Sequence, residues 1–190
     1  MRHILLVLAA LAALSVACAA PTTPTVPATP TPEPPDDGAT RVLEHEEFSF
    51  EYPASWTNRA DRYPGFVQPN PEFGTEEPAL VSGSGLGFFV GLRSLPEGTD
   101  LATLFADTYD RLVARELILK VVAQGETTLD GRAALEITYE RFWGEPLVRQ
   151  RDLWVEKDGR VYIVSCRAHP GRFEEGSESF ERLLSSFHLR

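Results

Sequence analysis

The chain has 190 residues, 43% of them hydrophobic, and a formal net charge of -10 at pH 7. This length and apolar content predict one globular domain rather than a disordered chain. The acidic balance argues against a nucleic-acid-binding protein, which needs clustered Lys and Arg to bind phosphates, and against direct adhesion to anionic lipid headgroups.

The N-terminus has the pattern of a secretory signal. Arg2 precedes an uncharged apolar run over residues 4–16, which is too short to span the ~30 Å hydrocarbon core of a bilayer. The run ends in Leu14-Ser15-Val16-Ala17-Cys18, which resembles the processing site of a bacterial lipoprotein. That resemblance implies a signal peptide over residues 1–17 and a palmitate-bearing Cys18 that anchors the protein on the extracytoplasmic face of the cell membrane. Cleavage after Ala19, without lipidation, is the alternative.

A Pro/Thr-rich segment separates this N-terminus from the rest of the chain. Residues 18–40 comprise the candidate lipidation site and this segment, whose prolines lack an amide hydrogen and favour extended polyproline II. At ~3.1 Å per residue, such a segment forms a semi-rigid spacer of about 60 Å. The folded domain is therefore expected over residues 41–190.

An alternating pattern opens the folded domain. Phe48, Phe50 and Tyr52 alternate with polar residues within residues 41–52. This period predicts a half-buried strand, and Pro53 is expected to end it because proline cannot donate a ladder hydrogen bond.

Pro and Gly repeatedly interrupt residues 57–85, so only short pieces of regular structure are expected there. Connections of this length are uncommon and often bind partners. Tyr63, Phe66 and Phe73 lie in this segment among polar neighbours. Two interpretations remain open: the rings pin the segment to the core, or they form a patch that binds a partner protein.

The remaining elements follow from periodicity and turn chemistry. Asp130-Gly131 and Asp158-Gly159 predict tight hairpin turns, because both turn positions need positive φ. Strands are expected over residues 86–93, 117–129, 133–140, 147–157 and 161–166, and the last is apolar on both faces and therefore central. Two helices are expected: one capped at Thr99 or Asp100 that buries Leu101, Leu104, Phe105, Thr108 and Leu112, and one over residues 173–184 with Phe180, Leu183 and Leu184 inward.

Two short stretches carry a resemblance to a known family. Phe48-Ser49-Phe50-Glu51-Tyr52-Pro53-Ala54-Ser55-Trp56 resembles the opening of PsbP-like (Mog1/PsbP-type) domains, and Phe180-x-x-Leu183-Leu184-x-Ser186-Phe187 resembles their C-terminal helix. The resemblance covers residues 41–190 and implies an antiparallel β-sheet flanked by α-helices, an α/β/α sandwich. Hairpin-linked strands with two amphipathic helices predict the same α+β class independently.

The titratable residues form no recognisable catalytic or metal-binding motif. His45, His169 and His188 are far apart in sequence and lack paired metal-ligand spacing. The pair Glu76-Glu77 is interpreted as a hydrated face, and Cys166 as a free thiol packed in a strand. No nucleophile motif is present, so we expect a non-enzymatic protein without a cofactor or metal.

Three functional hypotheses follow. The first is a lipid-anchored extracytoplasmic interaction or assembly module that docks onto a membrane or envelope protein complex, as the family resemblance suggests. The second is a small-molecule-binding lipoprotein with a pocket between sheet and helix. The third is an unrecognised hydrolase.

Overall fold

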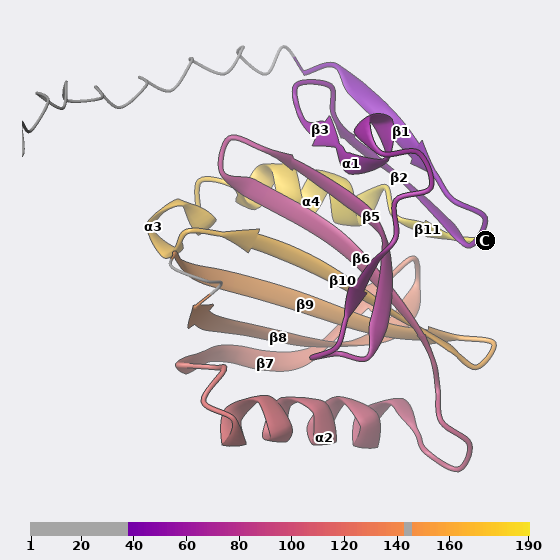
Figure 1. Ribbon diagram of the computed structural model, residues 1–190, viewed down its shortest axis with the longest axis vertical. Helices are drawn as coiled ribbons and strands as arrows, with labels where there is room; N and C mark the ends of the chain where they lie inside the picture. Colours follow the sequence, from indigo (N-terminus) through magenta and orange to yellow (C-terminus); the bar gives the residue numbers. More distant parts are fainter. Residues whose placement is uncertain (1–37, 143–145) are drawn as a thin grey trace, which may run out of the picture. The chain divides into compact units, whose positions relative to one another are not determined.

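The structure is a computed structural model that describes residues 38–142 and 146–190. The predicted signal peptide, Cys18 and most of the predicted spacer lie outside the described residues. Along the chain (Figure 1), the elements are β1 (Thr40–Glu44), β2 (Phe48–Pro53), β3 (Thr57–Asn58), α1 (Arg59–Arg62), β4 (Gln68–Asn70), β5 (Thr75–Gly83), β6 (Leu86–Ser94), α2 (Leu101–Ala114), β7 (Lys120–Leu129), β8 (Arg132–Phe142), β9 (Leu147–Lys157), β10 (Arg160–Ala168), α3 (Pro170–Phe173), α4 (Ser177–Ser185) and β11 (His188–Leu189).

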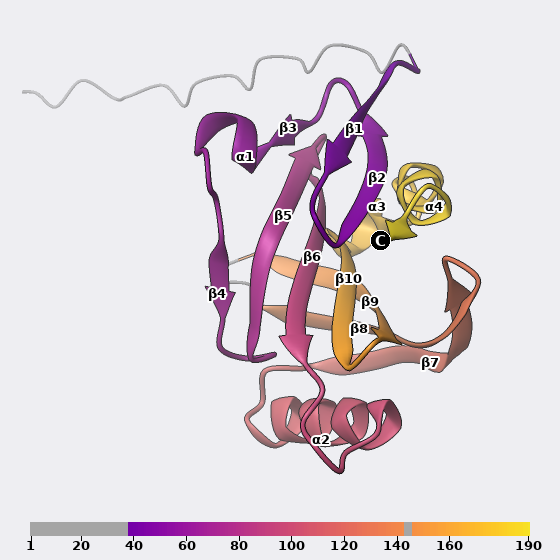
Figure 2. The same ribbon diagram turned by 90° about the vertical axis from the view of Figure 1, so that its right-hand side faces the viewer.

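The described strands form two antiparallel sheets. The large sheet has the order β3-β5-β6-β10-β9-β8-β7, with β4 paired to β5, and the small sheet has the order β1-β2-β11. Helices α2 and α4 lie on opposite sides of the large sheet (Figure 1, Figure 2). The predicted α+β class, an antiparallel sheet flanked by helices, is confirmed.

Alternation along the central strands divides the interior into two cores. Leu153, Val155 and Val164 face α4 and the small sheet, where they join Phe48 and Phe50 in a hydrophobic cluster. The residues between them on the same strands face α2, where they belong to a second hydrophobic cluster. This cluster comprises Phe73, Leu104, Phe105, Tyr109, Leu112, Ile118, Ile137, Tyr139, Trp154, Val161 and Ile163. Successive strand residues point to opposite faces, so β10 is covered on both sides, as its sequence predicts. We call the two sides the α4 face and the α2 face.

The hairpin turns and the cap of α2 form where the sequence predicts them. Asp130 and Gly131 have φ of 51° and 71°, and Asp158 and Gly159 have φ of 52° and 76°, so both predicted hairpin turns are confirmed. The Asp100 side chain accepts a hydrogen bond from Thr103 N at 2.7 Å, which confirms the predicted cap of α2.

Three predictions about elements need correction. The Pro- and Gly-rich segment contains β5, a strand of nine residues, because Pro78 falls within a register shift between Glu76 and Ala79 where no ladder bond is needed. The strand predicted over residues 41–52 is two strands joined by a turn. The last helix begins at Ser177, after the separate short helix α3.

Candidate functional site

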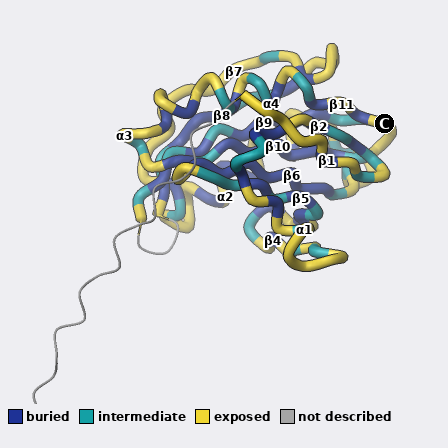
Figure 3. Tube along the Cα trace, turned by 90° about the horizontal axis from the view of Figure 1, so that it is seen from above, coloured by how far each residue is buried: buried dark blue, intermediate teal, exposed yellow. Residues whose placement is uncertain are grey.

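The residues predicted to bind a partner occupy different environments. Tyr63 ends α1 and is 49% exposed, with the Arg62 guanidinium 5.8 Å from its ring centroid. Phe66 is half-buried, and its backbone N donates to Tyr63 O at 2.9 Å. Gly65 between them has φ of 75°, a left-handed conformation that bends the chain back. Figure 3 shows α1 and the chain after it as exposed, in contrast to the buried centre of the sheet.

Phe73 is a core residue, and its prediction as a docking residue is wrong. It is 3% exposed, and its ring centroid lies 6.1 Å from that of Tyr109 and 6.3 Å from that of Trp154. The ring pins the end of the loop to the second core, as the other interpretation of this segment holds. Tyr63 and Phe66 remain available as candidate contact residues.

A groove of about 440 Å³ lies beside Phe66, between β1 and the α1 segment. We call it the Phe66 groove; apolar residues that line it include Val42, Leu43, Phe66, Val67 and Pro78. Val42 is 55% and Val67 52% exposed, so two large apolar side chains that line this groove reach solvent, and the exposed Tyr63 lies three residues before Phe66 in the chain. Neither valine is singled out by the sequence pattern, because isolated apolar residues in polar segments are common on surfaces.

Local polar contacts fix the walls of the Phe66 groove. The Asn58 side-chain oxygen Oδ1 accepts a hydrogen bond from Ala60 N at 3.0 Å and caps α1, while its side-chain nitrogen Nδ2 donates to Asp61 at 3.3 Å. Asp61 also pairs with Arg41 of β1 at 3.4 Å. The Asn58 contacts order the start of α1, and the exposed Arg41–Asp61 pair connects α1 to the small sheet.

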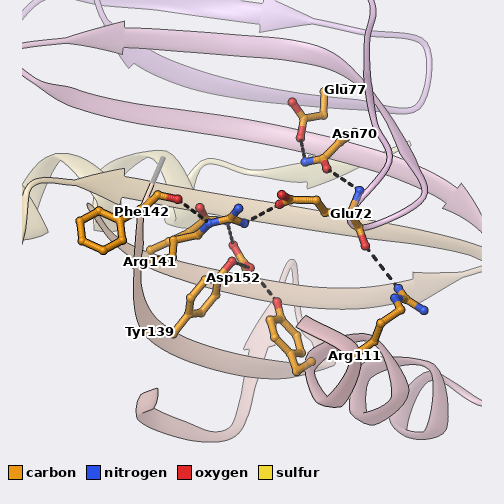
Figure 4. Close-up of polar contacts among 10 residues, drawn as sticks. Asn70, Glu72, Glu77, Arg111, Tyr139, Arg141, Phe142 and Asp152 are labelled. Atoms are coloured by element: carbon orange, nitrogen blue, oxygen red, sulfur yellow. Dashed lines mark hydrogen bonds and ion pairs between the residues drawn. The ribbon is translucent and has the colours of Figure 1, made fainter. Parts of the chain in front are cut away.

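The second candidate arrangement is a network of buried polar side chains on the α2 face. Asp152 of β9 is fully buried and accepts hydrogen bonds from the Tyr109 hydroxyl at 2.6 Å, the Tyr139 hydroxyl at 2.9 Å and the Gln150 amide at 2.9 Å. Trp154 Nε1 donates to the Tyr109 hydroxyl at 3.0 Å. Figure 4 shows Tyr139 and Asp152 meeting beneath Arg141.

Burial dominates the electrostatics of this network. It raises the pKa of Asp152 despite hydrogen bonds from Ser165, Tyr109, Gln150 and Tyr139 that favour the carboxylate. Burial, together with the Asp152 charge, raises the pKa of Tyr109 and Tyr139 well above the ordinary value. The hydroxyls therefore stay protonated and serve as donors, and the network satisfies a buried carboxylate rather than presenting it to a substrate.

A second set of polar contacts ties the loop before β5 to this network. Arg141 of β8 pairs with Glu72 at 2.6 Å, and Glu72 O accepts from Arg111 of α2 at 3.2 Å. Asn70 donates to the Glu77 carboxylate at 2.6 Å (Figure 4). Glu77 is 6% exposed and burial raises its pKa, so its interpretation as part of a hydrated face is wrong. The bulge in β5 turns this residue inward.

The sequence contained a partial signal for the buried carboxylates. Asp152 lies two residues before Trp154 on one strand, so the two share a face, and a polar residue beside a buried Trp requires a partner. Glu77 carries no comparable signal, because its face depends on a bulge. The buried Cys166 is a free thiol, as predicted, and burial raises its pKa strongly.

Two other kinds of feature are absent from residues 38–142 and 146–190. No group of three or more His, Cys, Asp or Glu side chains there is placed to hold a metal ion. None of the helices in those ranges is long and apolar enough to cross a membrane.

Comparison with known proteins identifies the family. The family model described as PsbP-like protein matches residues 35–189. The chain belongs to the PsbP-like protein family. No curated protein sequence matches it significantly.

Solved structures share the PsbP-like fold at low identity. Cyanobacterial PsbP (CyanoP) from Synechocystis is 13% identical with a TM-score of 0.58, over 80% of this chain and 92% of that chain. LpqN of Mycobacterium tuberculosis, described as involved in cell envelope biogenesis, is 16% identical with a TM-score of 0.50, over 80% and 90%. The Saccharomyces cerevisiae Ran-binding protein Mog1p is 10% identical with a TM-score of 0.52, over 80% and 95%. These likenesses show the fold alone.

Proposed function

We propose that this PsbP-like protein is a non-catalytic interaction or assembly module, anchored by lipid on Cys18 at the extracytoplasmic face of the cell membrane, which docks onto an envelope protein. The observation that carries the proposal is a pair of exposed apolar side chains, Val42 and Val67, that line the Phe66 groove, together with the exposed Tyr63 three residues before Phe66 in the chain. Exposing such side chains costs about 1.5–3 kcal/mol each relative to burial, and contiguous patches of this kind mark interaction sites.

The shape of this surface supports a docking role. Interfaces draw most of their binding energy from a few aromatic or large apolar anchors in pockets surrounded by polar residues. Tyr63 supplies a rigid exposed ring, and the groove beside Phe66 offers space for a partner side chain. The Arg41–Asp61 pair and other charged side chains form a polar rim.

A second exposed apolar set is a weaker candidate for docking. It comprises Val113, Leu119, Val121, Val122 and Phe142, near one end of the edge strand β7. Strand β7 has a register shift between Val121 and Ala123, and such bulges discourage pairing at a sheet edge. The docking site is therefore assigned to the Phe66 groove.

Similar proteins support the protein-binding role. One relative in fold is described as Ran-binding and another as involved in cell envelope biogenesis. The predicted signal peptide and a spacer of about 60 Å would present the domain to partners outside the cytoplasm.

Site-specific photo-crosslinking tests the docking surface. A photoreactive residue replacing Val67 should give a crosslinked envelope protein in intact cells, because Val67 is 52% exposed beside the groove. The same residue at Glu178, exposed on α4, is the matched control and should give much less product. Adding Tyr63→Ala should reduce the yield from position 67. Equal yields from positions 67 and 178 would assign the crosslinks to chance encounters.

Cys18→Ser tests the anchor separately. We expect the variant to leave the membrane fraction while its circular dichroism and melting temperature stay unchanged, because the substitution lies outside residues 38–190. Retention of the variant in the membrane fraction would contradict lipidation at this residue without bearing on the docking surface.

A further inference from the structure

A different groove opens at the end of the large sheet that carries the β5–β6 turn and α3 (Figure 1). Its volume is about 340 Å³, within the range of small-molecule sites. Three basic residues line it, namely Arg59, Arg167 and His169, and so do the apolar residues Leu80, Phe89 and Leu147. We call it the Arg167 groove.

The charge of this groove departs from that of the whole chain. The chain has 28 Asp and Glu against 18 Lys and Arg, yet none of the described residues that line the groove is acidic. The Phe66 groove, by contrast, is lined by Glu44 and Asp61. A local concentration of positive charge attracts anions even on a protein of negative net charge.

The strand register holds the Arg167 guanidinium on a rigid platform. Arg167 of β10 pairs with Gly87 of β6, and the guanidinium lies 4.3 Å from the ring centroid of Phe89. A Cβ at Gly87 would come within 3.1 Å of the Phe89 ring, so glycine there lets the ring lie along the strand under the cation. Such stacking suits Arg, whose planar guanidinium still presents N–H groups at its edge.

His169 and Arg59 complete an anion-binding arrangement. His169 Nδ1 accepts a hydrogen bond from Gly171 N at 3.2 Å, which places the proton of a neutral ring on Nε2, where it can donate. Arg59 is exposed at the start of α1. Burial lowers the pKa of Arg167 to about 10, partly opposed by the Glu77 carboxylate, so the guanidinium stays charged at neutral pH.

We propose that the Arg167 groove binds a small amphiphilic anion, a single alkyl chain that ends in a carboxylate or phosphate. The head group would contact Arg167, Arg59 and His169, and the alkyl chain would cover Leu80, Phe89 and Leu147. The inference is independent of the docking surface, because it rests on different residues. If the protein has a ligand-binding function, this proposal names the chemical class of its ligand.

Titration of matched amphiphiles tests the proposal. The full chain carrying Cys18→Ser is titrated with decanoate, decyl phosphate, decanol, decyltrimethylammonium and inorganic phosphate, and backbone amide signals are followed by NMR. Decanoate or decyl phosphate should shift the amides of Gly87, Phe89 and Arg167. Decanol and inorganic phosphate should bind roughly tenfold more weakly, because each lacks one half of the ligand. Tighter binding of decanoate would indicate a fatty-acid carboxylate as the head group, and tighter binding of decyl phosphate would indicate a lipid phosphate.

Variants localise the effect. Arg167→Gln should weaken binding of the preferred anion by roughly tenfold or more, and Arg59→Gln by a smaller factor. Arg115→Gln, on α2 outside the groove, is the matched control and should change nothing. Because Arg59 is exposed, its variant keeps the test valid if Arg167→Gln fails to fold. Equal affinity for decanol and decanoate, shifts confined to other residues, or equal weakening by Arg115→Gln would overturn the proposal.

Discussion

The two faces of the large sheet are filled by different chemistry. On the α4 face, aromatic rings from β2 stack on one another and on Phe187 within a large hydrophobic cluster. On the α2 face, the rings of Tyr109, Tyr139 and Trp154 surround the buried carboxylate of Asp152. The rings of the cluster on the α4 face gain stability from burial, which makes no directional demands. The α2 face depends on several hydrogen-bond donors that converge on the Asp152 carboxylate, and this geometric requirement specifies the position of α2.

The largest expected effect is on the α4 face. Phe50→Ala removes a ring that is 1% exposed, stacks with Phe48 and Phe187, and packs at a tilt against Phe88. We expect the free energy of unfolding to fall by about 3–5 kcal/mol, since large-to-small core substitutions lose burial and leave a cavity. Urea denaturation measures the change. A loss below about 1 kcal/mol would show that the small sheet contributes little to the core.

Asp152→Ala is the matching change on the α2 face. It leaves the Tyr109 and Tyr139 hydroxyls and the Gln150 amide without their acceptor. Each unsatisfied buried donor costs roughly 1–3 kcal/mol, although the losses do not add and removing a buried charge offsets part, so we expect a net loss of about 3 kcal/mol. Denaturant unfolding followed by tryptophan fluorescence reports it directly, because Trp154 is in the network. Unchanged stability would mean that the network is dispensable.

The contrast between the faces also explains what the sequence could predict. Periodicity identified the central strand β10, the exact span of β9 and the inward side of α4, because an apolar face is a local pattern. The Asp-Gly turns were predictable because positive φ restricts residue choice. Phe73 and Tyr63 lie on either side of β4 in one segment with similar neighbours, and only the packing of α2 against this segment separates a core ring from an exposed one. Burial of Glu77 depends on a bulge, which no local pattern indicates.

A smaller, pH-dependent effect distinguishes charge from hydrogen bonding at Asp152. Burial raises the folded-state pKa of this carboxyl above its unfolded value of 3.8. The folded state therefore binds the proton more tightly, and this contribution to stability is present below the unfolded pKa and lost as the pH rises through the folded pKa. The Asp152→Asn variant has no titratable group at this position, so its stability lacks this pH dependence. The stability of the original chain relative to this variant should therefore fall as the pH rises above the unfolded pKa of 3.8.

Urea unfolding of both proteins at a series of pH values measures the difference. The Asp152→Asn curve is its own control for all other titrating groups, because they are common to both chains. A stability difference that rises with pH would mean that the hydrogen bonds lower the pKa of Asp152 more than burial raises it.

The smallest expected effect on folding is at the proposed docking surface. Tyr63→Ala removes a ring that is 49% exposed and contacts the Arg62 guanidinium at 5.8 Å from its centroid. An exposed cation–π contact contributes about 0.5–1 kcal/mol at most, so the melting temperature should change by only a few degrees. Phe73→Ala, ten residues further along the chain and beyond β4, should instead cost about 3 kcal/mol, because its ring is in the core. If thermal unfolding showed equal losses for both variants, Tyr63 would belong to the packed interior, and the docking surface would have to be assigned to other residues.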